Sequence, residues 1–157
     1  MSSRVQTISC ERVADLVRKG AIPWPVTILD VRDVDFHGGC IRGAWHAPYD
    51  EAIGNLGALA VKLMRFALKM HSTSAGDRHL VICHCMLSKC RGPEIAIGLA
   101  STLPRMHVQW KREGSDLAQL DLPSIAVMEG GYEHFARLFG EKEPGLFADR
   151  PIQVVCE

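Results

Sequence analysis

The residues best suited to chemistry in this chain are Cys85 and Arg91, with five residues between them. They lie between an apolar segment, residues 79–84, that predicts a short strand and a segment from Gly92 that predicts a helix. Backbone N–H groups of a tight loop can converge on an anion, and a helix N-terminus adds a positive dipole. Arg91 offers a planar fork for two oxygens of an oxyanion, and the same positive fields favour the Cys85 thiolate. The spacing predicts a nucleophilic thiolate beneath a bound oxyanion, suited to attack phosphorus or arsenic.

The residues between Cys85 and Arg91 are predicted to surround the oxyanion with backbone N–H groups; they are Met86, Leu87, Ser88, Lys89 and Cys90. Lys89 either adds positive potential or is simply solvated. Cys90 is either a resolving thiol that forms a disulfide with Cys85 or a small loop residue, and strain in so short a loop favours the second reading. Cys83, on the apolar strand, is predicted to be a core residue and is the second-choice resolving thiol.

Strands and helices alternate along the chain. Apolar and β-branched residues predict strands at residues 26–31, 79–84 and 124–128. Caps and apolar spacing predict helices that start near Ser9 and near Gly92, and helices over residues 51–70 and 132–139. This alternation predicts one α/β domain over residues 1–157, with a mostly parallel central sheet flanked by helices on both faces. Cys85 would then follow the carboxyl end of a strand, where such sheets bind ligands. Residues 72–77 form a polar break, and residues 141–157 a tail of uncertain structure.

Polar residues at the strand ends are predicted to support the loop. Asp30 and Asp33 could act as acids, but residues in this position more often hold loops or pair with arginines such as Arg32 or Arg42. His84 directly precedes Cys85 and would point to the opposite face of the sheet. It is therefore expected to brace the loop by hydrogen bonds rather than to act as a base.

The composition excludes several classes of partner. The 157 residues contain 18 Lys and Arg against 18 Asp and Glu, so the net charge is zero and no basic excess is available to coat nucleic acid or an anionic membrane. The N-terminal residues lack a secretory pattern, and the longest apolar stretch, residues 56–70, is interrupted by Lys and Arg. A cytoplasmic location follows as an expectation. Six cysteines in such a chain are not expected to form a disulfide framework, and Cys10, Cys40 and Cys156 are expected to be incidental.

Several segments in order carry a family resemblance: residues 84–91, HCMLSKCR; 29–33, LDVRD; 38–44, GGCIRGA; 46–48, HAP; and 127–132, VMEGGY. With these segments the chain resembles the rhodanese-fold superfamily. More narrowly, it is similar to the branch that holds the dual-specificity phosphatases of the cell-division-cycle type and the eukaryotic arsenate/antimonate reductases. The resemblance extends from about Ser9 to Phe139. It implies a rhodanese-like fold with Cys85 and Arg91 as the catalytic pair.

Loop length and composition distinguish the branches of this superfamily. Sulfurtransferases of this fold carry a shorter loop, whereas residues 85–91 match the wider loop that fits phosphate or arsenate. The phosphatases carry acidic residues in this loop and several have a back-up cysteine after the first strand's aspartate. This chain has no carboxylate in the loop, and Val31 stands where the cysteine would be. A general acid is therefore missing from the expected place, and Glu94, in the first turn of the next helix, is the nearest carboxylate in sequence.

The resemblance, with this departure, favours an arsenate/antimonate reductase. Cys85 would attack the oxyanion, and an external thiol, supplied in the family by glutathione with glutaredoxin, would complete the reduction to the trivalent form. No bound cofactor or metal is implied. Phosphate esters could share the first step, so side phosphatase activity is expected.

The main alternative is a dual-specificity (tyrosine) protein phosphatase that acts through a cysteinyl-phosphate. A sulfurtransferase is disfavoured by the loop length, and a non-enzymatic interaction module by the intact Cys85 and Arg91 pair. A zinc site formed by Cys83, Cys85 and Cys90 fits the spacing of structural zinc ligands poorly and leaves Arg91 without a role.

Overall fold

The computed structural model describes residues 4–71 and 78–154. Its centre is a six-stranded sheet in which every neighbouring pair is parallel. In spatial order the strands are β1 (Gln6–Ile8), β6 (Ser124–Met128), β5 (Leu80–His84), β2 (Val26–Asp30), β4 (Trp45–His46) and β8 (Ile152–Gln153). A separate antiparallel pair joins β3 (Cys40–Ile41) to β7 (Phe147–Ala148). The predicted α/β class and parallel sheet are confirmed.

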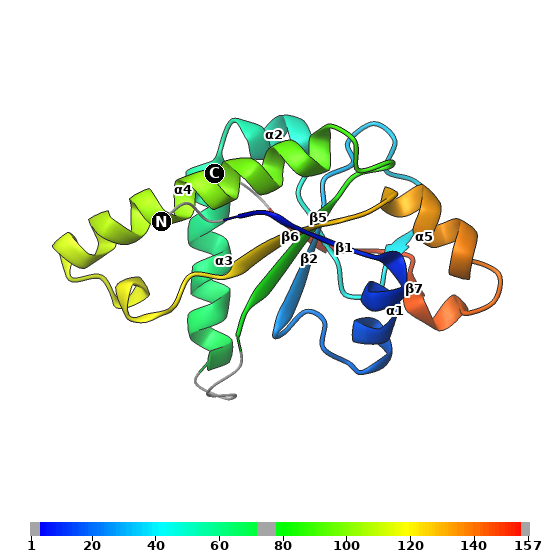
Figure 1. The fold of residues 1–157 in the computed structure, drawn as a ribbon, viewed down its shortest axis with the longest axis horizontal. Coiled ribbons are helices and arrows are strands. Elements are labelled where there is room, and N and C mark those ends of the chain that lie inside the picture. The colour runs from blue at the N-terminus through cyan, green and yellow to red at the C-terminus, as the bar shows by residue number, and fades with distance from the viewer. Residues whose placement is uncertain (1–3, 72–77, 155–157) are drawn as a thin grey trace.

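Helices cover both faces of this sheet (Figure 1). One face carries α2 (Tyr49–Ile53), α3 (Leu56–His71) and α4 (Arg91–Glu113), and the other carries α1 (Cys10–Arg18) and α5 (Gly131–Phe139). Short 3₁₀ turns occur at η1 (Asp116–Gln119) and η2 (Pro144–Leu146). The side chains of β5 alternate between the two cores, with Val81 and Cys83 facing α4 and Ile82 facing the α1 side.

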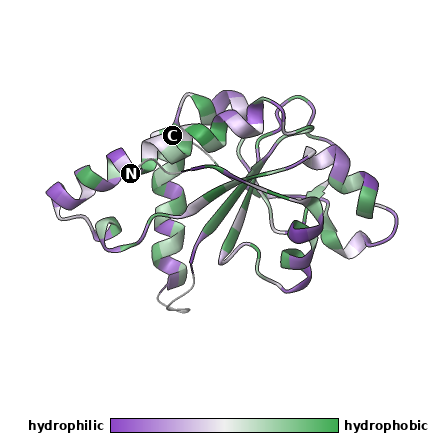
Figure 2. Ribbon diagram, viewed as in Figure 1, coloured by the Kyte–Doolittle hydropathy of each residue, from purple (hydrophilic) through white to green (hydrophobic). Residues whose placement is uncertain are grey.

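The central strands follow from their composition. All five residues of β2 are buried because helices cover both of its faces. Figure 2 shows hydrophobic residues along the central strands and mixed polarity on the helices. At α1, the Ser9 hydroxyl accepts a hydrogen bond from the Arg12 N–H at 3.2 Å, which confirms the predicted N-cap.

The prediction of one helix over residues 51–70 is wrong, because the chain forms two helices. Helix α2 ends at the cap residue Gly54, and α3 begins at Leu56. Asn55 makes the break favourable, because its side-chain amide donates to the Glu51 carbonyl at 2.9 Å. Its own carbonyl then accepts from the Leu59 N–H, so it starts the next helix. The same apolar spacing therefore serves two helices of different direction.

The tail is tied into the fold as far as residue 154. Residues Ile152–Gln153 form an edge strand beside β4, and Phe147–Ala148 pair with β3. Residues 72–77 and Cys156, which were assigned above from the sequence, lie outside the described residues. Among the helices of the described ranges, none has the length and apolar character needed to cross a membrane.

Candidate active site at the carboxyl end of β5

Cys85 directly follows β5, at the carboxyl end of the parallel sheet as predicted. Its side chain is only 3% exposed, yet it lines an open hollow of about 370 Å³. The other lining residues are Asp35, Met86, Leu87, Lys89, Cys90 and Arg91. The structure therefore brings together the predicted nucleophile, the predicted arginine and most of the loop.

The N-terminus of α5 holds the loop from one side. The backbone N–H of Tyr132 donates to the Cys85 carbonyl at 3.0 Å, and that of Glu133 donates to the Met86 carbonyl at 2.9 Å. Two loop carbonyls, which would repel an anion, are thereby bound to α5. Gly131 makes this approach sterically feasible, because a Cβ there would lie 2.4 Å from the Met86 oxygen. Gly131, the first residue of α5, is therefore required for the loop to approach this helix.

The N-terminus of α4 holds the loop from the other side. Gly92, in the first turn of α4, packs against the backbone of Cys85, and a Cβ on it would lie 3.1 Å from the Cys85 nitrogen. This close contact places the positive end of a 23-residue helix beside the thiol. Within the loop, Ser88 adopts a φ of +54°. Its hydroxyl oxygen is buried and finds no hydrogen-bond partner in residues 4–71 and 78–154.

Arg91 is held by two carboxylates from the loop after β2. Its Nη1 donates to Asp33 Oδ1 at 2.7 Å and to Asp35 Oδ1 at 2.8 Å, and its Nη2 donates to Asp35 Oδ2 at 2.6 Å. All three side chains are partly buried, and Arg91 is 25% exposed. The guanidinium lowers the pKa of Asp35 to about 2, chiefly through these hydrogen bonds. Of the two roles expected for Asp33, holding the loop is the one observed, because its Oδ1 accepts from the Val34 backbone N–H at 2.9 Å. Its arginine partner is Arg91 of the active loop and not Arg32 or Arg42.

A buried ion pair lies beneath the loop. Asp30 and Arg32 are both fully buried, and Arg32 Nη2 donates to Asp30 Oδ2 at 2.6 Å. The guanidinium carbon lies over the rings of Phe36 and Tyr132, at 4.5 and 3.8 Å from their centroids. This pairing of Asp30 with Arg32 matches the structural role expected for Asp30. Because Tyr132 also donates to the Cys85 carbonyl, the ion pair packs directly against a residue that holds the loop.

His84 is also a structural residue in this arrangement. Its Nδ1 donates to the Cys85 carbonyl at 3.1 Å, and its ring is fully buried. Burial is the main cause that lowers the pKa of His84, so the ring is neutral near pH 7. It lies on the α5 side, 6.2 Å from the Tyr132 ring, while Cys85 faces the α4 side. The predicted bracing role agrees with this geometry.

The remaining cysteines differ sharply in accessibility. Cys90 is exposed and lines the same hollow as Cys85. Cys83 is fully buried in the α4-side core, and burial raises its pKa to about 12. Cys10 and Cys40 are buried thiols that donate to backbone carbonyls. The five cysteines within the described ranges are all free.

The site contains a carboxylate that the sequence did not reveal. Asp35 reaches the hollow from the loop after β2, whereas Glu94, the nearest carboxylate in sequence, is exposed and accepts a hydrogen bond from the Tyr49 hydroxyl. A partial signal was available, because residues 33–35 read Asp-Val-Asp just after a predicted strand end. Across the described ranges, no cluster of three or more His, Cys, Asp or Glu residues is placed to hold a metal ion.

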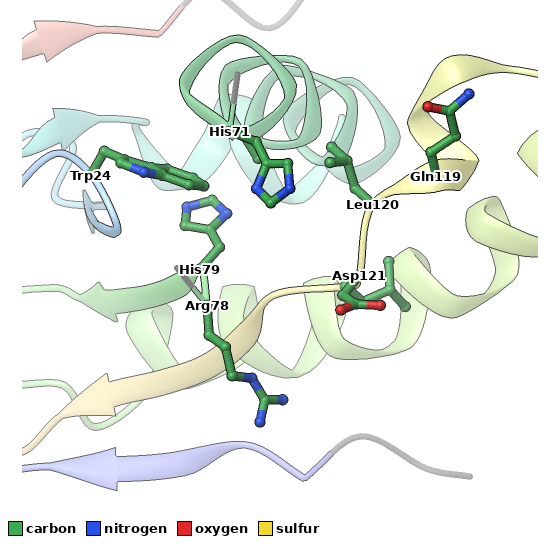
Figure 3. A pocket seen from close by; sticks show the side chains of 9 residues that line it. Trp24, His71, Arg78, His79, Gln119, Leu120 and Asp121 are labelled. Atoms are coloured by element: carbon green, nitrogen blue, oxygen red, sulfur yellow. The ribbon is translucent and has the colours of Figure 1, made fainter. Parts of the chain in front are cut away.

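A second, more enclosed hollow of about 140 Å³ lies at the opposite end of the strands (Figure 3). The rings of Trp24 and His79 lie in tilted contact, 4.9 Å between centroids, on one side, and Leu120 and Asp121 lie on the other. His79 immediately precedes β5, whereas Cys85 immediately follows it. This hollow is therefore separated from the thiol by the length of the strand.

Solved structures show what this fold is similar to. The yeast protein tyrosine phosphatase Ygr203w of the rhodanese family aligns over 94% of both chains with a TM-score of 0.68 and 24% identity. The As-Sb reductase from Leishmania major aligns over 92% of this chain and 85% of its own, with a TM-score of 0.61 and 22% identity. At these identities the likeness establishes the fold, and the fold is that of the rhodanese class.

Comparison with curated relatives identifies the family within the rhodanese class. No protein-family model matches the chain. The CDC25-like phosphatase YCH1 of Saccharomyces cerevisiae is 30% identical over 119 residues, which cover 76% of this chain and 71% of YCH1. The dual specificity phosphatase ibp1 of Schizosaccharomyces pombe is 28% identical over 126 residues, 77% of this chain and 82% of ibp1. The chain belongs to the family of CDC25-like phosphatases with a rhodanese fold.

Proposed function

We propose that this protein hydrolyses phosphate esters, with tyrosine-type aryl esters of phosphoproteins as the substrate class, through a cysteinyl-phosphate on Cys85. The observation that supports this most directly is the shared hollow, in which Cys85, the loop and Arg91 meet at the N-terminus of α4. The family membership points in the same direction. The hollow is open to solvent, which suits a phosphate group presented on a larger molecule.

The mechanism uses the residues already described. The phosphate binds at the N–H groups of the loop and at the Arg91 fork, with the Cys85 sulfur behind the phosphorus. The thiolate forms the S–P bond while the bond from phosphorus to the ester oxygen breaks, and the leaving oxygen takes up a proton. Water then attacks phosphorus, the S–P bond breaks, and Cys85 regains its electron pair as thiolate.

Asp35 changes which of the two functions supported by the sequence is the favoured one. The sequence favours the reductase because the loop contains no carboxylate, which removes the proton donor that an ester leaving group needs. The structure places a carboxylate in the same hollow from a different loop. The premise about the loop holds, but it no longer argues against ester hydrolysis.

Arsenate/antimonate reduction is the second candidate, and the exposed Cys90 thiol in the same hollow is the observation that favours it. Cys85 would displace water from arsenate to form an S–As(V) adduct. A second thiol, from glutathione or glutaredoxin or from Cys90, would attack the Cys85 sulfur. The two sulfurs lose two electrons and form a disulfide, and arsenic leaves as As(III).

A side-by-side assay tests these functions. Wild type, Cys85→Ser and Arg91→Lys would be given an aryl phosphate, a phosphotyrosine peptide, arsenate with glutathione and glutaredoxin, and thiosulfate. We expect phosphopeptide turnover and, after rapid acid quench, a phosphate adduct on the Cys85 peptide, both lost in Cys85→Ser. Arg91→Lys should weaken substrate binding because lysine lacks the fork. Arsenate turnover well above that of both phosphate esters would make the reductase the main function.

A further inference from the structure

The carboxylate of Asp35 and the phosphate of a substrate would compete for the same guanidinium. Both nitrogen ends of Arg91 are engaged by Asp35, at 2.8 Å to Oδ1 and 2.6 Å to Oδ2. This is the fork geometry in which arginine binds a phosphate oxygen pair. The cluster of Arg91, Asp33 and Asp35 carries one positive and two negative charges, so it does not attract an anion while the carboxylates remain in place. Binding therefore requires Arg91 to exchange Asp35 for phosphate.

Asp35 is the carboxylate that this exchange leaves beside the reacting centre. Among the described residues that line the hollow with Cys85, it alone bears a carboxyl group. Asp33 contacts Arg91 through Oδ1 but is not part of the lining. Glu94 lies outside the lining and is engaged by Tyr49. The other ionisable groups of the hollow are Arg91, Lys89, Cys85 and Cys90.

From this arrangement we propose that Asp35 is the general acid of ester cleavage and is released for that role when the substrate phosphate takes over Arg91. The proposal rests on the phosphatase function proposed above. While Arg91 binds Asp35, the carboxyl group is fully ionised, with its pKa held at about 2. Once the guanidinium turns to the phosphate, the carboxylate loses its cation and gains a neighbouring dianion, and both changes favour protonation. Binding of the substrate phosphate to Arg91 therefore favours the protonated form of Asp35.

Asp35 transfers one proton in each of the two chemical steps. As the Cys85 sulfur bonds to phosphorus, the electron pair of the breaking P–O bond moves to the leaving oxygen, and that oxygen receives the Asp35 proton. In the second step water gives a proton to the Asp35 carboxylate as its oxygen bonds to phosphorus. The S–P bond breaks and its electron pair returns to Cys85. Asp35 ends protonated and returns the proton to solvent when phosphate leaves and Arg91 binds it again.

The dependence on the leaving group tests this assignment. Asp35→Asn keeps a hydrogen-bonding side chain of the same size but has no acidic proton. For phenyl phosphate, whose leaving group has a pKa of ~10 like that of tyrosine, we expect turnover to fall by roughly 100- to 10,000-fold. For a nitrophenyl phosphate, whose leaving oxygen needs less proton assistance, the loss should be much smaller. Asp35→Glu should restore part of the phenyl phosphate activity, and the basic limb of the wild-type kcat profile should disappear in Asp35→Asn.

Two control variants separate this role from others. Asp33→Asn removes a charge from the same arginine and should change KM while keeping the wild-type ratio between the two substrates. Asp121→Asn, at the far end of the sheet, should leave both parameters unchanged. An equal loss on both substrates in Asp35→Asn, or a gain on both, would show that Asp35 only positions or restrains Arg91, and would overturn the assignment. If no phosphocysteine forms in any protein tested, the phosphatase function itself is overturned. If Asp35→Asn forms phosphocysteine from phenyl phosphate at the wild-type rate, only the assignment of Asp35 as the general acid is overturned.

Discussion

The backbone N–H of Tyr132 lies 3.0 Å from the Cys85 carbonyl oxygen and donates to it. This bond ties the first turn of α5 to the residue that bears the nucleophile, although the two are far apart in the sequence. The same tyrosine ring lies 3.8 Å from the buried Arg32 guanidinium. The shape of the active loop therefore depends on α5 and on the ion pair below it, in addition to the loop's own sequence.

Gly131→Ala should abolish most activity by displacing the loop. The new Cβ would lie 2.4 Å from the Met86 oxygen, and the residue would have to keep a φ of +68°. The loop must then move away from α5, so the Tyr132 and Glu133 hydrogen bonds are lost. Turnover of an aryl phosphate by the purified, folded variant measures this effect.

Gly114→Ala is the matched control for this substitution. Gly114 has a φ of +69°, almost the same as Gly131, but a Cβ there meets nothing within 4 Å. It ends α4 at the end remote from the loop. We expect a loss of stability of about 1 kcal/mol from the left-handed backbone and unchanged turnover. Similar activities for the two alanine variants would show that the α5 contact does not shape the loop.

Asp30→Asn should destabilise the fold strongly. It leaves the Arg32 charge fully buried without its counter-charge, and breaking a buried pair in this way costs about 3–5 kcal/mol. The midpoint of urea unfolding measures the change. Glu143→Gln breaks the exposed pair with Arg18 and should shift that midpoint little, because exposed pairs contribute little. Equal midpoints for Asp30→Asn and wild type would contradict the expectation.

Acid should destabilise the protein through its buried histidines. The Thr27 hydroxyl donates to the Pro23 carbonyl and accepts from His79 Nε2, while the buried Nδ1 of His79 has no hydrogen-bond partner among the described residues. Burial lowers its pKa from 6.5 to about 4. Between these values the unfolded chain binds a proton that the folded chain does not. Stability is therefore fully present above pH 6.5 and decreases as the pH falls towards 4, by up to roughly 3 kcal/mol.

His79→Gln tests this slope, because glutamine cannot titrate. The free energy of unfolding between pH 7 and pH 4 should change less with pH in this variant than in wild type, whatever its absolute stability. His84 contributes a residual slope of the same sign, since burial lowers its pKa too. His37→Gln, at an exposed position, should keep the wild-type slope. The idea fails if His79→Gln and wild type have parallel profiles.

The sequence predicts well where local pattern and tertiary environment agree. The strands β2, β5 and β6 are apolar and β-branched, and their predicted positions are confirmed to within one residue. The edge strands β1 and β8 are three and two residues long, too short to show a period, and the sheet partner defines them. The break at Gly54 and Asn55 is not predicted from the sequence, because apolar spacing continues across it.

The candidate site also has one part that the sequence predicts and one part that it does not. Cys85 and the loop are contiguous in sequence, so their spacing carries the prediction. Asp35 is 56 residues from Arg91, and only the pairing of β2 with β5 brings the two loops together. No local pattern contains that pairing, which is why the sequence predicted a site without a carboxylate.

Alkylation should distinguish the thiols of Cys83, Cys85 and Cys90 by their accessibility. In the folded protein, iodoacetamide should label Cys90, which is exposed, and leave Cys83 unlabelled, because its full burial and a pKa of about 12 suppress both access and thiolate. Tungstate, a phosphate mimic, should protect Cys85. Peptide mass spectrometry reads each site, and labelling in denaturant confirms that every thiol is detectable.

The result also decides which thiol could resolve an arsenic adduct within the chain. A Cys83 that stays unlabelled cannot be reached by Cys85 without local unfolding, which leaves Cys90 or an external thiol. In a single turnover of arsenate without glutathione, Cys90→Ser should then lower the yield of arsenite, while Cys83→Ser should match wild type. Labelling of Cys83 at the rate of Cys90 would contradict the burial on which this reasoning rests. If neither protein forms arsenite until glutathione is added, and both then form it equally, resolution is assigned to the external thiol.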